Sequence, residues 1–349
     1  MQETQTGDAG RIWTPEGLEF SVETTNKPLG RLHSHAGTIT KGTVKIGDAV
    51  HLEVDGDRRD RIRANHSATH LLHAALRNRL GGHVTQKGSL VSDDRFRFDF
   101  SHPKPLSEED IAAVEAEVNE EIRANEQVGT RLMTPDDAVA AGALALFGEK
   151  YGDEVRVLSM GRKGGEGRNY SVELCGGTHV KATGDIGLFR ITLEASAAAG
   201  VRRIEAVTGE HALSVMRQQE RALSEIAATV KSTPDNAAER VRNQAQKVRE
   251  LEKEIERLKQ KLASGAGSDL TDEVQEIAGV KVLATQLDGA DGKTLRVTMD
   301  KLKDKLGSAI ILLSAVDGDK VALVAGVTKD LTDRFKAGDL LKHVAEQVD

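Results

Sequence analysis

Residues 65–82 read NHSATHLLHAALRNRLGG, and this stretch decides how the chain is interpreted. Its apolar residues from Leu71 to Leu80 recur at intervals of three and four, which is the spacing of one face of an α-helix. Gly81-Gly82 follows and predicts the end of that helix. His66 and His70 stand four residues apart, so their imidazoles share one helical face. The first expectation is therefore a helix that carries two potential metal ligands.

The histidine pair alone leaves two interpretations open. Two imidazoles at this spacing can bind one divalent metal, and they can equally be exposed side chains of an amphipathic helix. A second segment, Cys175-Gly176-Gly177-Thr178-His179, adds the only thiol of the chain, a third imidazole, and two glycines that let the backbone turn both side chains toward one point. Zinc prefers nitrogen and sulfur ligands. The two segments together predict a metal site, for which His66, His70, Cys175 and His179 offer donor atoms that match this preference.

Paired helical histidines also begin the H-E-x-x-H motif of zinc peptidases, in which the glutamate is the base. Ser67 occupies the position of that glutamate here, which excludes the peptidase interpretation. Four protein ligands are typical of a closed structural zinc, whereas a catalytic zinc keeps one position for water or substrate. The sequence leaves open whether all four side chains bind at once.

The composition excludes several classes of protein. Of 349 residues, 38% are hydrophobic and 30% charged, which is typical of globular protein rather than of disorder or membrane spans. No apolar run is long enough to span a membrane and the N-terminus has no signal-peptide pattern, so we expect a cytoplasmic protein without a membrane partner. A net charge of −7 argues against a surface that binds nucleic acid all over, and no DNA partner is expected. A single cysteine excludes an internal disulfide.

The fold class predicted is α+β. Residues 1–63 hold short apolar runs between turn residues and predict a small β-barrel-like unit. This unit begins with an apparent turn at 6–10 and no strand before it, so we expect sequence to be missing upstream. Residues 64–209 mix helical and strand patterns, including an alternating Arg95–Phe100 strand, and predict an α+β domain that contains the zinc site.

Residues 210–263 are rich in Ala, Glu, Gln, Arg and Lys, and Pro234 divides them into two predicted helices of a hairpin. The second helix carries a heptad seam, which could pack within the chain or join two chains as a homodimer. The seam consists of Val241, Val248, Leu251, Ile255, Leu258 and Leu262.

The last part, residues 264–349, is predicted to be an α/β module. It begins with a flexible linker at 264–268. Strands are expected near 280–287, 295–299, 309–316 and 321–327, with helices near 300–306 and 331–348.

Several long motifs follow one another in an order that resembles the bacterial alanyl-tRNA synthetases. They are Asn65–His73, Gln86–Ser89, Arg97–His102, Cys175–His179 and Arg202–Gly209. The resemblance runs from Thr6 to Val348 and implies an editing domain, a helical connector and a C-terminal tRNA-binding module; free-standing alanyl-tRNA editing proteins are similar too. It also implies that His66, His70, Cys175 and His179 bind zinc and that Thr69 and Gln86 are the catalytic-pocket residues that sense the misattached amino acid.

The function implied by this resemblance is hydrolysis of tRNA(Ala) mischarged with serine or glycine. Glycine is smaller than alanine and serine adds only a hydroxyl, so a synthetic site rejects both weakly and a second site is needed. Thr69 and Gln86 would hydrogen-bond the serine side chain, while zinc would anchor the ester or polarise a water. The alternative is a non-catalytic, zinc-stabilised tRNA-binding module.

A complete synthetase would add an ATP-dependent activation domain and a tRNA-recognition domain ahead of this region. Neither is present in the sequence, so we expect either a fragment of the ligase or a free-standing editing protein that acts in trans.

Two basic segments leave alternatives open. Residues 161–168 could contact an acceptor stem or form a plain hairpin loop. Arg202 and Arg203 could contact phosphate or form surface ion pairs with Glu205 or Glu210. The other histidines are interpreted as structural or solvated: His33, His35, His51, His73, His83, His102, His211 and His343.

Overall fold

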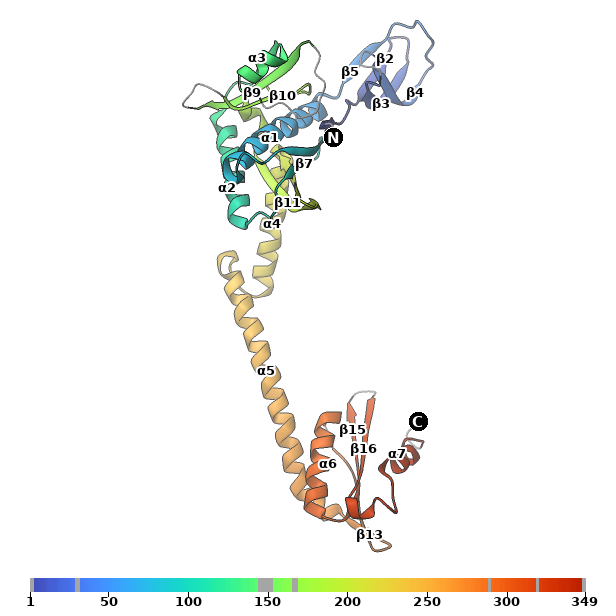
Figure 1. The fold of residues 1–349 in the computed structure, drawn as a ribbon. Helices are drawn as coiled ribbons and strands as arrows, with labels where there is room; N and C mark the ends of the chain where they lie inside the picture. Colours follow the sequence, from blue (N-terminus) through green and yellow to red (C-terminus); the bar gives the residue numbers. More distant parts are fainter. Residues whose placement is uncertain are drawn as a thin grey trace. The chain divides into compact units, whose positions relative to one another are not determined.

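The computed structural model describes residues 3–28, 32–143, 153–164, 169–287, 290–317 and 320–346. The chain divides into two compact units, Met1–Ala222 and Leu223–Asp349, which are described separately below (Figure 1). Over the described residues the fold is α+β, as predicted. The helices in this part of the chain are too short or too polar to cross a membrane. The finer division into four parts remains a prediction.

The first unit is built on a five-stranded sheet. Its strand order is β1 (Glu3–Gln5), β6 (Gln86–Val91), β7 (Phe96–Ser101), β12 (Val201–Thr208) and β11 (Phe189–Ala198). Only the β1–β6 pair is parallel. Helices α1 (Gly56–Leu80) and α2 (Glu108–Ala124) pack against this sheet and each other (Figure 1). The alternation expected of the phenylalanine strand is confirmed, since Phe96, Phe98 and Phe100 are all fully buried in the core between sheet and helices.

Helix α1 positions the histidines. It begins where the Asp55 side chain accepts a hydrogen bond from the Arg58 backbone and ends at Gly81, whose positive φ of 112° suits glycine. From Ala64 to Leu76 every residue is buried, which is the behaviour of a helix enclosed on all sides. His66 and His70 are 1% and 3% exposed. The interpretation of these two residues as exposed side chains is therefore wrong.

A second, antiparallel sheet lies beside α1 and carries the cysteine segment. Its strand order is β10 (Asn169–Leu174), β9 (Val155–Lys163) and β8 (Gly129–Met133). Strand β10 contacts α1 and ends at the residue before Cys175. The short helices α3 (Pro135–Ala140) and η1 (Thr183–Ile186) complete this part of the unit.

The N-terminal β unit differs from its prediction in two ways. It is a sheet with the order β4 (Ser34–Lys41), β3 (Glu19–Asn26), β2 (Gly10–Trp13) and β5 (His51–Val54). A barrel closes only if its outermost strands pair, and over the described residues β4 and β5 do not, so the barrel prediction is wrong. The turn at 6–10 is also preceded by a strand, β1, which pairs with β6 of the central sheet.

The second unit contains a long helix and an α/β module. After α4 (Gly209–Thr229), Pro234 opens α5 (Pro234–Asp269) at the predicted position. The sheet has the order β13 (Gln275–Ile277), β14 (Val280–Gln286), β15 (Ala309–Asp317) and β16 (Lys320–Val327). Helix α6 (Gly292–Leu306) packs on β15 and β16, and η2 (Leu270–Glu273), η3 (Lys329–Leu331) and α7 (Ala337–Ala345) complete the module.

Two predictions for the second unit are wrong. The segment 264–268 continues α5 instead of forming a flexible linker, because extending an existing helix needs no new nucleus and each glycine costs only about 1 kcal/mol. The predicted strand at 295–299 lies inside α6. Leu295, Met299 and Leu302 are buried at helical spacing, and Asp291 caps the helix by accepting from the Thr294 backbone.

Candidate metal centre

The structure brings the four predicted ligands together. His66 and His70 extend from consecutive turns of α1, while Cys175 and His179 come from the segment after β10. One ligand atom from each side chain can be chosen so that all four lie within 4.8 Å of one another. The Cys175 sulfur lies 3.5 Å from His66 Nε2 and 3.2 Å from His179 Nε2. This spacing suits a set of side chains that share one ion.

Space rather than backbone conformation explains one of the two glycines. A Cβ added to Gly177 would lie 2.5 Å from His66 Nδ1 and 2.9 Å from Gln5 Oε1. A Cβ added to Gly176 would meet nothing within 4 Å. Only Gly177 is therefore required for the close approach of this segment to α1.

Each histidine of the cluster has a polar partner at Nδ1. His70 Nδ1 lies 2.6 Å from Glu173 Oε2, and His66 Nδ1 lies 2.8 Å from Gln5 Oε1. His179 Nδ1 lies 3.3 Å from the hydroxyl of Ser67. Metal-binding histidines ordinarily hold their second ring nitrogen in this way, which leaves the first nitrogen for the ion.

A further observation indicates that the donor atoms of the cluster suit a metal ion. His70 Nε2 is buried and has no hydrogen-bond partner among the described residues, although a buried polar atom is ordinarily paired. A metal ion is one partner that would satisfy this nitrogen. The structure therefore supports a site that could hold a metal.

The electrostatics of the cluster centre on Glu173, which accepts from His70 and from His73 Nδ1 at 2.8 Å. Burial alone would raise the pKa of Glu173, but the charges and hydrogen bonds of the two histidines hold it well below its usual value. Burial likewise opposes ionisation of Cys175, yet the neighbouring imidazoles of His66 and His70 lower the thiol pKa to about 7. Burial, with the charges of His70 and His66, lowers the pKa of His179. A thiolate and a neutral imidazole, which are the forms that bind metals, are thus favoured at these two positions.

The two predicted pocket residues lie in the same unit, but no hydrogen bond among the described residues joins them to the cluster. Thr69 is buried on α1, and its hydroxyl donates to the Asn65 carbonyl at 2.9 Å. Gln86 opens β6, and its side-chain Nε2 is buried without a partner among the described residues. Their role in a pocket remains a prediction.

Sequence reasoning missed three residues of the cluster. His73 is not solvated; it is buried, bonded to Glu173, and stands three residues after His70, a spacing that could have revealed it. Glu173 stands two residues before Cys175, and this closeness to a predicted ligand could also have identified it as part of the cluster. Gln5 carried no signal, because its proximity depends on β1, which the sequence did not predict.

The structure shows the partners of Arg202 and Arg203, for which the sequence left phosphate contacts and ion pairs open. Arg202 forms two hydrogen bonds with Glu194, at 2.6 and 2.7 Å, and Arg203 forms two with Asp99, at 2.7 and 2.9 Å. Both arginines are ion-paired, but with partners other than the two predicted glutamates. Residues 165–168 of the predicted loop lie outside the described residues.

Comparisons with known proteins agree with the resemblance seen in the motifs. Residues 155–205 match the family described as threonyl and alanyl tRNA synthetase second additional domain, and residues 279–349 match the DHHA1 domain. An alanine–tRNA ligase of Rhizorhabdus wittichii is 58% identical over 341 residues, which cover 97% of this chain and 38% of that protein.

Two further alanine–tRNA ligases match almost as well. The one of Sphingopyxis alaskensis is 56% identical over 97% of this chain and 39% of its own length. The one of Halorhodospira halophila is 54% identical over 99% of this chain and 39% of its own length. The chain therefore spans less than two fifths of the length of these relatives. Over nearly all of its residues the chain is therefore similar to part of the alanine–tRNA ligases.

Proposed function

We propose that this chain hydrolyses the ester bond of tRNA(Ala) mischarged with serine or glycine, at a site that holds zinc. The observation that carries the proposal is the buried convergence of three imidazoles and one thiol in a region that overlaps the second additional domain of alanyl and threonyl tRNA synthetases. His66, His70, Cys175 and His179 would hold the ion. Zinc is the metal proposed because one sulfur and three nitrogens are the ligands it prefers, and because the low pKa of Cys175 provides a thiolate at neutral pH.

Zinc, when bound, would supply a Lewis acid that polarises the ester or a water molecule. The residues of the chain would orient the substrate around it. The buried side-chain amide N–H of Gln86 has no partner among the described residues. It could donate a hydrogen bond to the hydroxyl of a seryl group. An alanyl group would leave that donor unpaired, at a cost of about 1–3 kcal/mol. Gln86 would therefore favour seryl over alanyl esters. Thr69 would contribute from α1, where it directly precedes the metal ligand His70.

The alternative function is a zinc-stabilised tRNA-binding module without catalysis. The binding module and the hydrolase predict different results with seryl-tRNA(Ala), because only a hydrolase releases serine. The test incubates the chain with seryl-tRNA(Ala) in the absence of ATP and measures free serine, with alanyl-tRNA(Ala) as the control substrate. We expect serine release that a zinc chelator abolishes and added zinc restores, and no release by the Cys175→Ala variant.

Binding of the tRNA without release of serine would refute the hydrolase and favour the binding module. Full activity of Cys175→Ala would refute the assignment of the metal ligands. Loss of selectivity against alanyl-tRNA(Ala) in Gln86→Leu, with zinc content unchanged, would support the role given to Gln86.

A further inference from the structure

One oxygen atom joins the two halves of the metal cluster. Gln5 Oε1 lies 2.8 Å from His66 Nδ1, 3.0 Å from the backbone nitrogen of Thr178 and 3.2 Å from the Thr178 hydroxyl. His66 belongs to α1, and Thr178 to the segment that carries Cys175 and His179. Gln5 thus contacts both ligand-bearing segments from a third place in the chain.

These contacts determine which nitrogen of His66 carries hydrogen. A backbone N–H can only donate, so the atom that faces the Thr178 backbone must be an acceptor, which identifies it as the amide oxygen of Gln5. An acceptor cannot bond to another acceptor, so His66 Nδ1 must donate. The lone pair of a neutral His66 is then on Nε2, the nitrogen that lies 3.5 Å from the Cys175 sulfur. Gln5 therefore selects the tautomer that can bind a metal at the centre of the cluster.

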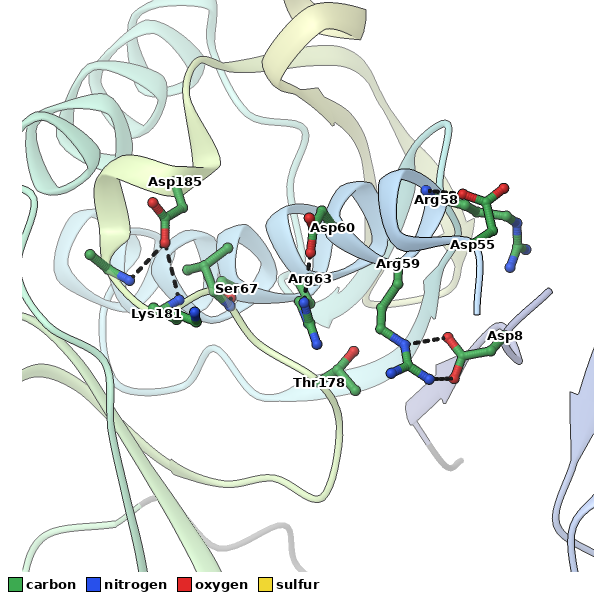
Figure 2. A network of polar contacts seen from close by, with 12 residues as sticks. Asp8, Asp55, Arg58, Arg59, Asp60, Arg63, Ser67, Thr178, Lys181 and Asp185 are labelled. Atoms are coloured by element: carbon green, nitrogen blue, oxygen red, sulfur yellow. Dashed lines mark hydrogen bonds and ion pairs between the residues drawn. The ribbon is translucent and has the colours of Figure 1, made fainter. Parts of the chain in front are cut away.

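The segment around Gln5 is held in place on both sides. Strand β1 pairs with β6, with Gln5 opposite Val91, and the next backbone N–H donates to the Val91 carbonyl at 2.9 Å. On the C-terminal side of Gln5, Arg58 Nη1 donates a hydrogen bond to the Gly7 carbonyl at 2.8 Å. Arg59 donates two hydrogen bonds to the Asp8 carboxylate. Figure 2 shows Arg59 and Asp8 facing each other, with Asp55 at the start of the same helix. The N-terminal segment is thus fastened to the helix that carries His66.

We propose that Gln5 is a positioning residue of the metal centre, acting as the hydrogen-bond acceptor that fixes the His66 ring and ties it to the Cys175–His179 segment. The proposal rests on the zinc site of the proposed function. Gln5 accepts a hydrogen bond from His66 as the Glu173 carboxylate does from His70, although Gln5 stands 61 positions before His66 in the sequence. Because Gln5 accepts all three bonds, the acceptor oxygen rather than the amide nitrogen matters.

The test compares two substitutions of similar size. Gln5→Leu removes the acceptor, and we expect zinc affinity, measured by competition with a chromogenic chelator, to fall about 10- to 100-fold. Gln5→Glu keeps an oxygen acceptor, and we expect it to bind zinc as tightly as the unaltered chain or more tightly. Thr6→Val is the matched control in the same segment, since the Thr6 hydroxyl has no partner among the described residues, and it should leave the affinity unchanged.

A second readout separates positioning from general packing. Long-range nitrogen–proton NMR correlations report which ring nitrogen of His66 is protonated before zinc is added. We expect Nδ1–H in the unaltered chain and in Thr6→Val, and a mixture of both tautomers in Gln5→Leu.

The outcomes are distinguishable. If the unaltered chain binds no zinc, the proposed function fails at its first step and this inference fails with it. If the unaltered chain binds zinc and Gln5→Leu binds it equally well, only the inference is overturned. Equal loss of affinity in Gln5→Leu, Gln5→Glu and Thr6→Val would also overturn it, because the docking of β1 and not the acceptor would then be what matters.

Discussion

Replacing Gly177 by alanine should disable the metal centre while leaving the fold intact. The new Cβ would overlap His66 Cε1 and stand 2.5 Å from His66 Nδ1, whereas ordinary van der Waals contact begins near 3.4 Å. The His66 ring or the 175–179 segment would therefore have to move by more than about 0.9 Å. Metal–ligand distances tolerate deviations of only about 0.2 Å, so at least one ligand would leave its bonding position. Since loss of a supporting partner alone costs 10- to 100-fold in affinity, we expect zinc affinity to fall by at least about 100-fold.

The assay is a competition titration with a chromogenic chelator on Gly177→Ala and on its neighbour, Gly176→Ala. The added Cβ at 176 meets nothing within 4 Å, so this variant should bind zinc like the unaltered chain. Circular dichroism should show both variants folded. Normal zinc affinity in Gly177→Ala, or equal losses in the two variants, would refute the reasoning from close packing.

Three further predictions follow from the same structure. Cys175 is the only thiol, so thiolate absorbance near 240 nm in zinc-free protein should rise with a midpoint at about pH 7, since its histidine neighbours outweigh burial; a midpoint near 9 would contradict the pKa argument. Phe98→Ala should lower the free energy of unfolding of the first unit by about 3–5 kcal/mol in urea, because the ring is fully buried, and a loss below about 1 kcal/mol would show that it is not. The α5 seam side chains are 42–54% exposed at Val241, Val248, Leu251, Ile255 and Leu258. We predict that they pair two copies of the chain, so sedimentation should show a dimer that Leu251→Glu converts to monomer; a monomer before substitution would contradict this.

Local patterns predicted the parts of the fold that depend on local physics. The heptads and Pro234 predicted α5, and the alternation from Arg95 to Phe100 predicted β7. The prediction of a strand at 295–299 was wrong because a short apolar run fits both a helix and a strand. In the structure this run is helical: Asp291 caps the helix, and the residues at 295, 299 and 302 are buried on one face.

In the metal centre, too, local patterns predicted some residues, whereas others depend on long-range contacts. The four clustered ligands were found because each pair is four residues apart and bears metal-binding groups. Glu173 and His73 lie close to those motifs, but their burial and mutual hydrogen bond depend on β10 meeting α1. Gln5 could not be found, because a parallel pairing between β1 and β6 is a long-range contact without a local pattern.

The central claim is that two distant segments bind one zinc ion through three nitrogens and one sulfur. X-ray absorption spectroscopy of the purified chain, with its zinc content measured on the same sample, tests it most directly. We expect one zinc per chain, with nitrogen neighbours at about 2.0–2.1 Å and a single sulfur at about 2.3 Å. A chain without zinc, or a zinc surrounded by oxygen and nitrogen alone, would contradict it.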